Sequence, residues 1–176
     1  MLLKFKNLTI RNATVNDADL LAKWWNDGKI MSHAGFPLGT GETPEKIAEK
    51  ISKDADEVCR RLIIEFDNNP IGEMSYYNVG DDTAEIGIKI CDFSKQNQGY
   101  GKILLSMLIS SLYDDLGYKV IDISTNVKNT RAQHVYEELG ASKVQVIDDA
   151  WRDQLGVLQS IVEYKLYPES FVNFAK

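Results

Sequence analysis

A glycine-containing turn at Gln96–Lys102, with the sequence Gln-Asn-Gln-Gly-Tyr-Gly-Lys, has residue types and spacing suited to chemistry. It lies between a predicted strand that ends near Ile90 and a predicted long helix. A turn that enters a helix leaves backbone N–H groups unpaired at the positive end of the helix dipole, which suits a phosphate or pyrophosphate. Gly99 and Gly101 permit close approach of such a ligand. The alternative is a plain loop before a helix.

Two familiar nucleotide motifs do not fit this turn. The third glycine of a dinucleotide-binding Gly-x-Gly-x-x-Gly motif is replaced by Leu104. A Walker loop requires Gly-Lys-Ser/Thr after a run of four residues, and that ending is missing. The predicted anion site therefore belongs to another class.

At this point the sequence resembles the GNAT superfamily of acyl-CoA-dependent N-acyltransferases. Three residues match the family's phosphate-binding signature, Gln/Arg-x-x-Gly-x-Gly/Ala: Gln96, Gly99 and Gly101. Three later residues match its Asn-x-x-Ala motif with Tyr four residues on: Asn129, Ala132 and Tyr136. The resemblance is specific over Ala84 to Ala141. It is weaker over Leu8 to Trp25, which resembles the family's first strand and helix. This segment is similar to that of the branch containing ribosomal-protein N-terminal and small-amine acetyltransferases.

The resemblance implies that acetyl-CoA is the acyl donor and that the turn holds its pyrophosphate. The turn residues concerned are Gln96, Asn97, Gln98, Gly99, Tyr100, Gly101 and Lys102, with the Gln96 side chain as a neutral donor where many relatives have Arg. The exposed backbone edge of Ile88, Lys89 and Ile90 would pair with the pantetheine amides like an added strand. A plain core strand is the alternative for these three residues.

The resemblance also implies that Asn129 contacts the pantetheine arm and that Tyr136 donates a proton to the leaving thiolate. From the residues alone, Asn129 also fits a helix cap, and Tyr136 also fits a core tyrosine beside Val135 and Leu139. Backbone N–H groups near Ile90 would polarise the thioester carbonyl.

An amine attacks a thioester only when neutral, and lysine-type amines have a pKa of about 10.4, so some group must accept a proton. Glu85, in the strand Ala84–Ile90, is the first candidate for this catalytic base, and a solvent-facing strand residue is its alternative. Glu73 and His33 are the runners-up. Four residues are candidates for the acceptor pocket, although tryptophans at helical spacing also fit a core: Trp24, Trp25, His33 and Phe36.

The elements expected to position these residues indicate an α+β fold on a mixed, largely antiparallel sheet flanked by helices. Strands are predicted at 8–11, 62–66, 71–79, 84–90, 118–125, 143–147 and 157–166. Helices are predicted over 15–25, from 44 through 51, from 100 through 116 and from 131 through 139. The segment 27–43 has four glycines and no period, so it reads as a loop. The strands before and after the long helix are predicted to be parallel.

Composition limits the remaining functions. The chain has 176 residues and a net charge of -6, with no basic cluster along the sequence, so nucleic acid is not an expected partner. No segment is apolar enough for a membrane helix or a signal peptide, which predicts a cytoplasmic protein without a membrane partner. Cys59 and Cys91 lack the spacing of a metal or redox site, so no metal is expected.

We therefore expect residues 1–176 to form a single acyl-CoA N-acyltransferase domain. The expected reaction is direct attack of a primary amine on acetyl-CoA in a ternary complex, without an acyl intermediate on Cys91. The alternative is a non-catalytic acyl-CoA-binding or sensor domain. The acceptor is a small-molecule amine or a peptide N-terminal amine, and the sequence does not decide between them. Pairing of two copies through the sheet or the late hairpin is common among proteins of this kind.

Overall fold

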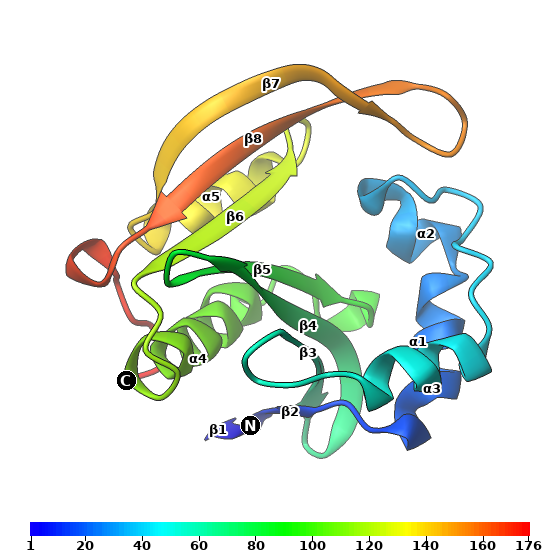
Figure 1. The fold of residues 1–176 in the computed structure, drawn as a ribbon, viewed down its shortest axis with the longest axis horizontal. Helices are drawn as coiled ribbons and strands as arrows, with labels where there is room; N and C mark the ends of the chain where they lie inside the picture. Colours follow the sequence, from blue (N-terminus) through cyan, green and yellow to red (C-terminus); the bar gives the residue numbers. More distant parts are fainter.

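One sheet connects all parts of the chain, and the computed structural model describes residues 1–176 of it (Figure 1). Its strand order is β1-β2-β3-β4-β5-β6-β8-β7. The strands are β1 (Leu2–Phe5), β2 (Leu8–Asn12), β3 (Cys59–Phe66), β4 (Asn69–Gly80), β5 (Thr83–Ile90), β6 (Val120–Asn126), β7 (Ser142–Arg152) and β8 (Leu158–Leu166). All neighbouring pairs are antiparallel except β5 and β6, which are parallel. This confirms the mixed α+β sheet.

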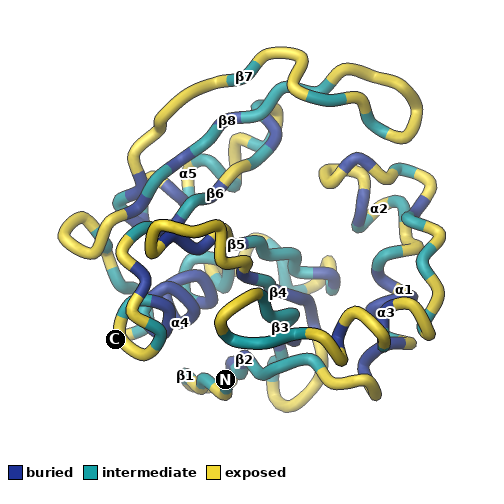
Figure 2. The backbone as a smooth tube through the Cα atoms, in the orientation of Figure 1, coloured by how far each residue is buried: buried dark blue, intermediate teal, exposed yellow.

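Helices cover both faces of the sheet. They are α1 (Ala18–Trp25), α2 (Gly28–Met31), α3 (Pro44–Ser52), α4 (Tyr100–Asp114) and α5 (Thr130–Glu138). Figure 1 shows α1, α2 and α3 grouped together, away from α4 and α5. In Figure 2 much of α4 is coloured as buried, whereas most of β7 is exposed.

Two apolar clusters lie on opposite faces because successive strand residues point in opposite directions. Leu62 and Ile64 of β3 belong to the larger cluster, which contains the buried stripe of α4. Ile63, between them, belongs to the smaller cluster under α1 and α3. Both sets of helices are thus fixed to the same strands, so the residues on the two faces are held at defined positions.

The parallel pair β5–β6 separates shortly after it begins. Only three residue pairs join the two strands, the last being Glu85 with Asp122. The remainder of β5 stays paired with β4 as far as Ile90, so its other edge is free. This separation opens the sheet between β5 and β6, directly before the turn that leads into α4.

Three elements differ from expectation. Strand β1 was not predicted, since its hairpin turn uses Lys6 at φ 53 instead of a glycine signature. The segment 27–43 contains the short helix α2, whose Asp27 cap accepts from the Lys29 backbone N–H. Trp151 lies within β7, whereas the sequence placed it in a connection. The central meander, α4 and the last hairpin are confirmed.

Candidate active site

A cleft of about 670 Å³ lies where β5 and β6 separate, and we call it the large cleft. Its wall combines the free edge of β5, the turn before α4, the first turn of α4, the end of β6 and one side of α5. The predicted donor-binding residues in its lining are Ile88, Lys89, Ile90, Gln96, Asn97, Gly99, Tyr100, Gly101, Lys102, Asn129 and Tyr136. Gln98 is outside the lining, and its side chain donates back to the Ser94 carbonyl.

The turn before α4 leaves room for a ligand at its glycines. Gly99 has φ +79, a left-handed conformation that favours glycine, and caps the N-terminus of α4. A Cβ built on Gly99 or Gly101 would meet no atom within 4 Å. The first backbone N–H groups of α4 have no acceptor within the helix, and their residues line the large cleft at the positive end of a helix of 15 residues.

The side chain of Gln96 departs from the expected role. Its Nε2 group donates to the Ile90 carbonyl at 2.8 Å, so it joins the turn to the end of β5. Its Oε1 accepts from Arg131, whose Nη1 also donates to Asn97. Gln96 is thus not a free donor in this structure, and it holds the shape of the turn instead.

The lining of the large cleft is basic although the whole chain is acidic. Its lining residues include five lysines or arginines and one carboxylate, Glu138: the basic residues are Lys29, Lys89, Lys95, Lys102 and Arg131, of which Lys89 turns its ammonium group to Glu73 in the small pocket described below. Lys102 is paired with Glu138 at 3.1 Å. Residues far apart in the sequence supply this charge, so the sequence contained no basic cluster to detect. The excess of positive charge suits a ligand with several phosphates.

Tyr136 reaches the large cleft from α5, and its ring packs against Tyr164 at a centroid distance of 5.7 Å. Burial, and secondarily the nearby Tyr164, raise the pKa of Tyr136 to about 12. Its hydroxyl has no partner in the protein and is not among the buried unpartnered atoms, so it is open to the cleft. Tyr136 is therefore a neutral hydroxyl that can donate a proton there.

Asn129 is the helix cap that the sequence offered as one of its two roles, and it also lines the large cleft. Its Oδ1 accepts from the Ala132 backbone N–H at 3.2 Å, which caps α5. Its Nδ2 donates to Thr125 Oγ1 on β6, and the residue also lines the large cleft. The cap thus ties the start of α5 to the end of β6 beside the cleft.

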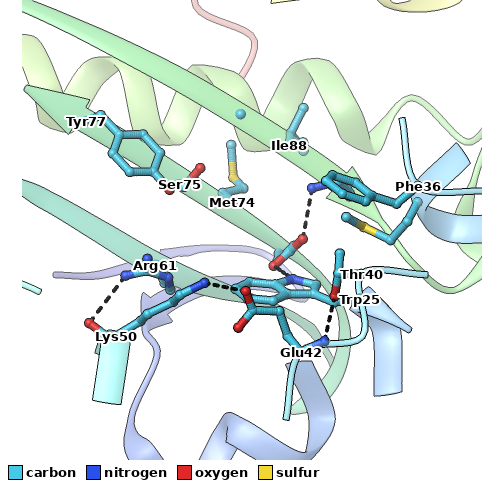
Figure 3. A pocket seen from close by; sticks show the side chains of 14 residues that line it. Trp25, Phe36, Thr40, Glu42, Lys50, Arg61, Met74, Ser75, Tyr77 and Ile88 are labelled. Atoms are coloured by element: carbon cyan, nitrogen blue, oxygen red, sulfur yellow. Dashed lines mark hydrogen bonds and ion pairs between the residues drawn. The ribbon is translucent and has the colours of Figure 1, made fainter. Parts of the chain in front are cut away.

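A second cavity of about 290 Å³, the small pocket, lies on the other side of β5. Figure 3 shows the side chains of its lining, among them Trp25 at the end of α1, Phe36 in the segment after α2, and Ser75 and Tyr77 of β4. Its remaining lining residues are Met31, Thr40, Glu42, Lys50, Arg61, Glu73, Met74, Gly87, Ile88 and Lys89. Gly87, Ile88 and Lys89 line both cavities, so the two cavities meet along this part of β5.

Glu73 is the buried carboxylate of the small pocket, with 8% of its surface exposed. Its Oε2 accepts from Trp25 Nε1 at 2.8 Å, and its Oε1 accepts from Lys89 Nζ at 3.0 Å. Glu73 and Lys89 are register partners on β4 and β5, which places both side chains on the pocket face. The carboxylate is therefore held in one orientation beside the place where the cavities meet.

The other charged groups of the small pocket are paired as well. Lys50 binds Glu42 at 2.7 Å, and Arg61 pairs with Asp54 behind the pocket. Glu42 Oε2 is buried without a hydrogen-bond partner. Each carboxylate of the lining thus already has a lysine of the same chain as its counterion.

Several residues predicted from the sequence lie elsewhere. Trp24 is 8% exposed and belongs to the small apolar cluster, so its expected role in the acceptor pocket was wrong. The core alternative holds for it, because α1 turns Trp24 toward the sheet and Trp25 toward the pocket. His33 is exposed and lines the large cleft, not the small pocket.

Glu85 is exposed and lines neither cavity. Its register partner on β4 is Tyr77, which does line the small pocket, so Glu85 lies on the same sheet face at the rim. Cys91 is buried, and burial followed by the charge of Glu73 raises its pKa to about 12. Its thiol is therefore protonated and a poor nucleophile at neutral pH.

The last hairpin bridges to the segment after α2. Gln154 accepts from the Leu38 N–H and donates to the Gly39 carbonyl, both at 2.9 Å, and its own N–H donates to the Gly35 carbonyl. A Cβ on Gly35 would come within 2.4 Å of the Trp151 ring. This bridge closes the side of the large cleft where Trp151 and His33 lie.

Comparison with known proteins places this geometry in a family. A protein-family model, described as "Acetyltransferase (GNAT) domain", matches residues 7–142 of this chain. The chain therefore belongs to the GNAT family of acetyltransferases. No protein of curated function matches the sequence significantly. No helix is long and apolar enough to cross a membrane, and no cluster of three or more His, Cys, Asp or Glu side chains is arranged to hold a metal ion.

Solved structures share the whole architecture. A probable acetyltransferase aligns with a TM-score of 0.83 at 20% identity, over 97% of this chain and 99% of the other. The spermidine N-acetyltransferase from Vibrio cholerae, solved with CoA and spermine, aligns with a TM-score of 0.82 at 22% identity, over 96% and 99%. A GNAT acetyltransferase from Bacillus anthracis aligns with a TM-score of 0.78 at 18% identity, over 96% and 99%.

Proposed function

We propose that this protein transfers an acetyl group from acetyl-CoA to the primary amine of a small molecule, by direct attack within a ternary complex. The observation that carries the proposal is the meeting of the large cleft and the small pocket along Gly87–Lys89. Tyr136 lies on the cleft side and Glu73 on the pocket side. A proton donor thus lines one of the two meeting cavities, and a proton acceptor lines the other.

The large cleft is the proposed donor site, since its open glycine turn, helix N-terminus and basic lining fit the pyrophosphate of CoA. The donor supplies an activated acyl carbon with a thiolate leaving group. The free edge of β5 at Ile88, Lys89 and Ile90 is available for backbone pairing with the pantetheine amides. Tyr136 donates its proton to the departing sulfur.

The small pocket is the proposed acceptor site. Its volume of about 290 Å³ and its aromatic walls, Trp25, Phe36 and Tyr77, suit a small amine. We propose Glu73 as the group that accepts the amine proton, since it lines the pocket and Trp25 fixes its orientation. Glu85, the first candidate from the sequence, remains a proposal for a water-mediated role from the rim.

One feature of the comparison supports a small amine. The Vibrio cholerae relative in fold acts on spermidine and was solved with spermine, both small polyamines. In this chain, however, Glu42 and Glu73 are each already paired with a lysine, so the pocket offers no free carboxylate to a polycation. We therefore propose acceptors that carry a single amine.

Elements from α1 to β8 all contribute residues to the two cavities, so the proposed catalytic unit is the whole of residues 1–176.

The test is a panel of amines with acetyl-CoA, with release of free thiol as the measurement. Monoamines, polyamines, amino sugars and short peptides are compared at equal concentration, with Tyr136→Phe as the matched control. Thiol release that depends on the amine and falls in the control supports acetyl transfer. Tight CoA binding without any amine-dependent release would instead identify a non-catalytic acyl-CoA sensor.

A further inference from the structure

We propose that Lys89 is a site of self-acetylation, modified by the acetyl-CoA bound to the same chain. The inference rests on the proposed donor site in the large cleft. Lys89 is the lysine common to the linings of both cavities, and its side chain is 35% exposed. Its amine therefore lies within the acceptor pocket while its backbone belongs to the edge of the donor cleft.

The contact with Glu73 supplies what an attacking amine requires. Lys89 Nζ donates to Glu73 Oε1 at 3.0 Å, in the position that an acceptor ammonium would take beside this carboxylate. Trp25 holds the other oxygen, so the carboxylate does not turn away from Lys89. The chain thus presents a primary amine of its own at the position where the amine of a substrate is proposed to bind.

The reaction balances with groups already present. Lys89 Nζ gives one proton to Glu73 and attacks the thioester carbonyl carbon, forming the amide N–C bond. The C–S bond breaks and its electron pair leaves with sulfur, which is protonated by Tyr136. The second proton of the attacking nitrogen restores the Tyr136 hydroxyl through solvent. The products are acetyl-lysine, the thiol of CoA and one released proton.

Acetylation removes the positive charge of Lys89 and therefore breaks its ion pair with Glu73. Glu73 then keeps the Trp25 hydrogen bond and has one oxygen free for an incoming amine. The modification would thus convert a self-paired pocket into one that binds an external ammonium group. Acetylation of Lys89 should raise the rate of acceptor turnover. A reaction started with unmodified protein should therefore show a lag before it reaches its steady rate.

The experiment incubates the full chain with acetyl-CoA and no added amine, followed by intact-mass measurement and peptide mapping. We expect one acetyl group per chain, located on Lys89. Lys89→Arg keeps a cation beside Glu73 and should take up no acetyl group at this position. Lys143→Arg, on the exposed strand β7, should still take up one acetyl group on Lys89. Tyr136→Phe should slow the modification about a hundredfold if the enzyme catalyses it.

Lys50 is an internal control within each sample. It lines the small pocket and is paired with Glu42, but it does not line the large cleft. Its peptide should stay unmodified. Acetyl groups spread over exposed lysines with Lys89 unmodified would overturn the inference. The amine panel is read independently, so amine-dependent thiol release with unmodified Lys89 rejects self-acetylation and leaves the proposed function standing.

Discussion

Trp25 and Glu73 are joined by a hydrogen bond of 2.8 Å across 48 positions of sequence. The indole comes from the end of α1 and the carboxylate from the middle of β4. The helical layer thus orients the carboxylate in the floor of the small pocket, and the pocket's chemistry depends on both layers.

Replacing Trp25 with Phe keeps an aromatic wall and removes the N–H donor to Glu73. Hydrogen bonds to charged groups contribute about 1.5–3 kcal/mol, so a loss of about tenfold or more in kcat/KM for the amine is expected. CoA affinity should stay unchanged, because Trp25 does not line the large cleft. Equal kinetics in the variant would show that Glu73 needs no help from the indole.

Gly101→Val tests the donor site without disturbing the fold. A Cβ at Gly101 meets no atom within 4 Å, so the melting temperature should be close to that of the wild type. Two extra methyl groups beside the turn should block the pyrophosphate and weaken CoA binding about tenfold or more, measured by calorimetry. Gly101→Ala should give a smaller loss. Unchanged affinity in the Val variant would move the donor site elsewhere.

Tyr136→Phe should lower kcat about hundredfold with little change in CoA affinity, because the hydroxyl acts as charge develops on sulfur. Burial raises the Tyr136 pKa to about 12, above its ordinary value of 10.0. The proton donor is therefore retained below that pKa and lost as the pH rises through it. Loss of the Tyr136 proton should consequently not lower wild-type turnover between about pH 8 and 10. A Phe variant with full turnover would return Tyr136 to a packing role.

Glu73→Gln and Glu85→Gln form a matched pair on one sheet face. Glutamine keeps the size and cannot accept the amine proton, so Glu73→Gln should lose about a hundredfold in rate at neutral pH. Its rate should recover toward about pH 10, where amines lose the proton unaided. Both variants are measured at saturating acetyl-CoA across pH. A larger loss in Glu85→Gln would restore the exposed carboxylate as the base.

Cys91 offers a test of direct transfer. Its raised pKa of about 12 keeps the thiol protonated, and its side chain is buried. Cys91→Ser should therefore retain turnover within about twofold, and the native thiol should resist alkylation. An acetyl group trapped on Cys91, with a large loss of turnover in the Ser variant, would indicate a covalent intermediate instead.

The lining of the large cleft, the proposed donor site, could largely be predicted from the sequence, because many of its residues belong to two short motifs that resemble those of the GNAT family. Helix rules alone place the turn at Gly99 beside the start of α4, and they place Asn129 next to the start of α5 and Tyr136 within it. The basic lining could not be predicted this way, since Lys29 and Arg131 come together only when α2 and α5 are placed around the sheet.

The small pocket illustrates the opposite case. Arg61, Ser75 and Gly87 lie side by side only through the registers of β3, β4 and β5, and two of these pairings include bulges. A shift of one residue reverses which side chains face the pocket, so no local pattern specifies its lining. For the same reason periodicity did not separate the core residue Trp24 from the pocket residue Trp25.

The bridge between Gln154 and Leu38 has a consequence for how the protein matures during synthesis. The two residues are 116 positions apart, so this wall can close only after the chain has been synthesised as far as Gln154. The turn before α4 and the separated strands precede it in the chain. The residues of the turn are therefore synthesised before the bridge can form, and loop-closure entropy makes the bridge a late step of folding.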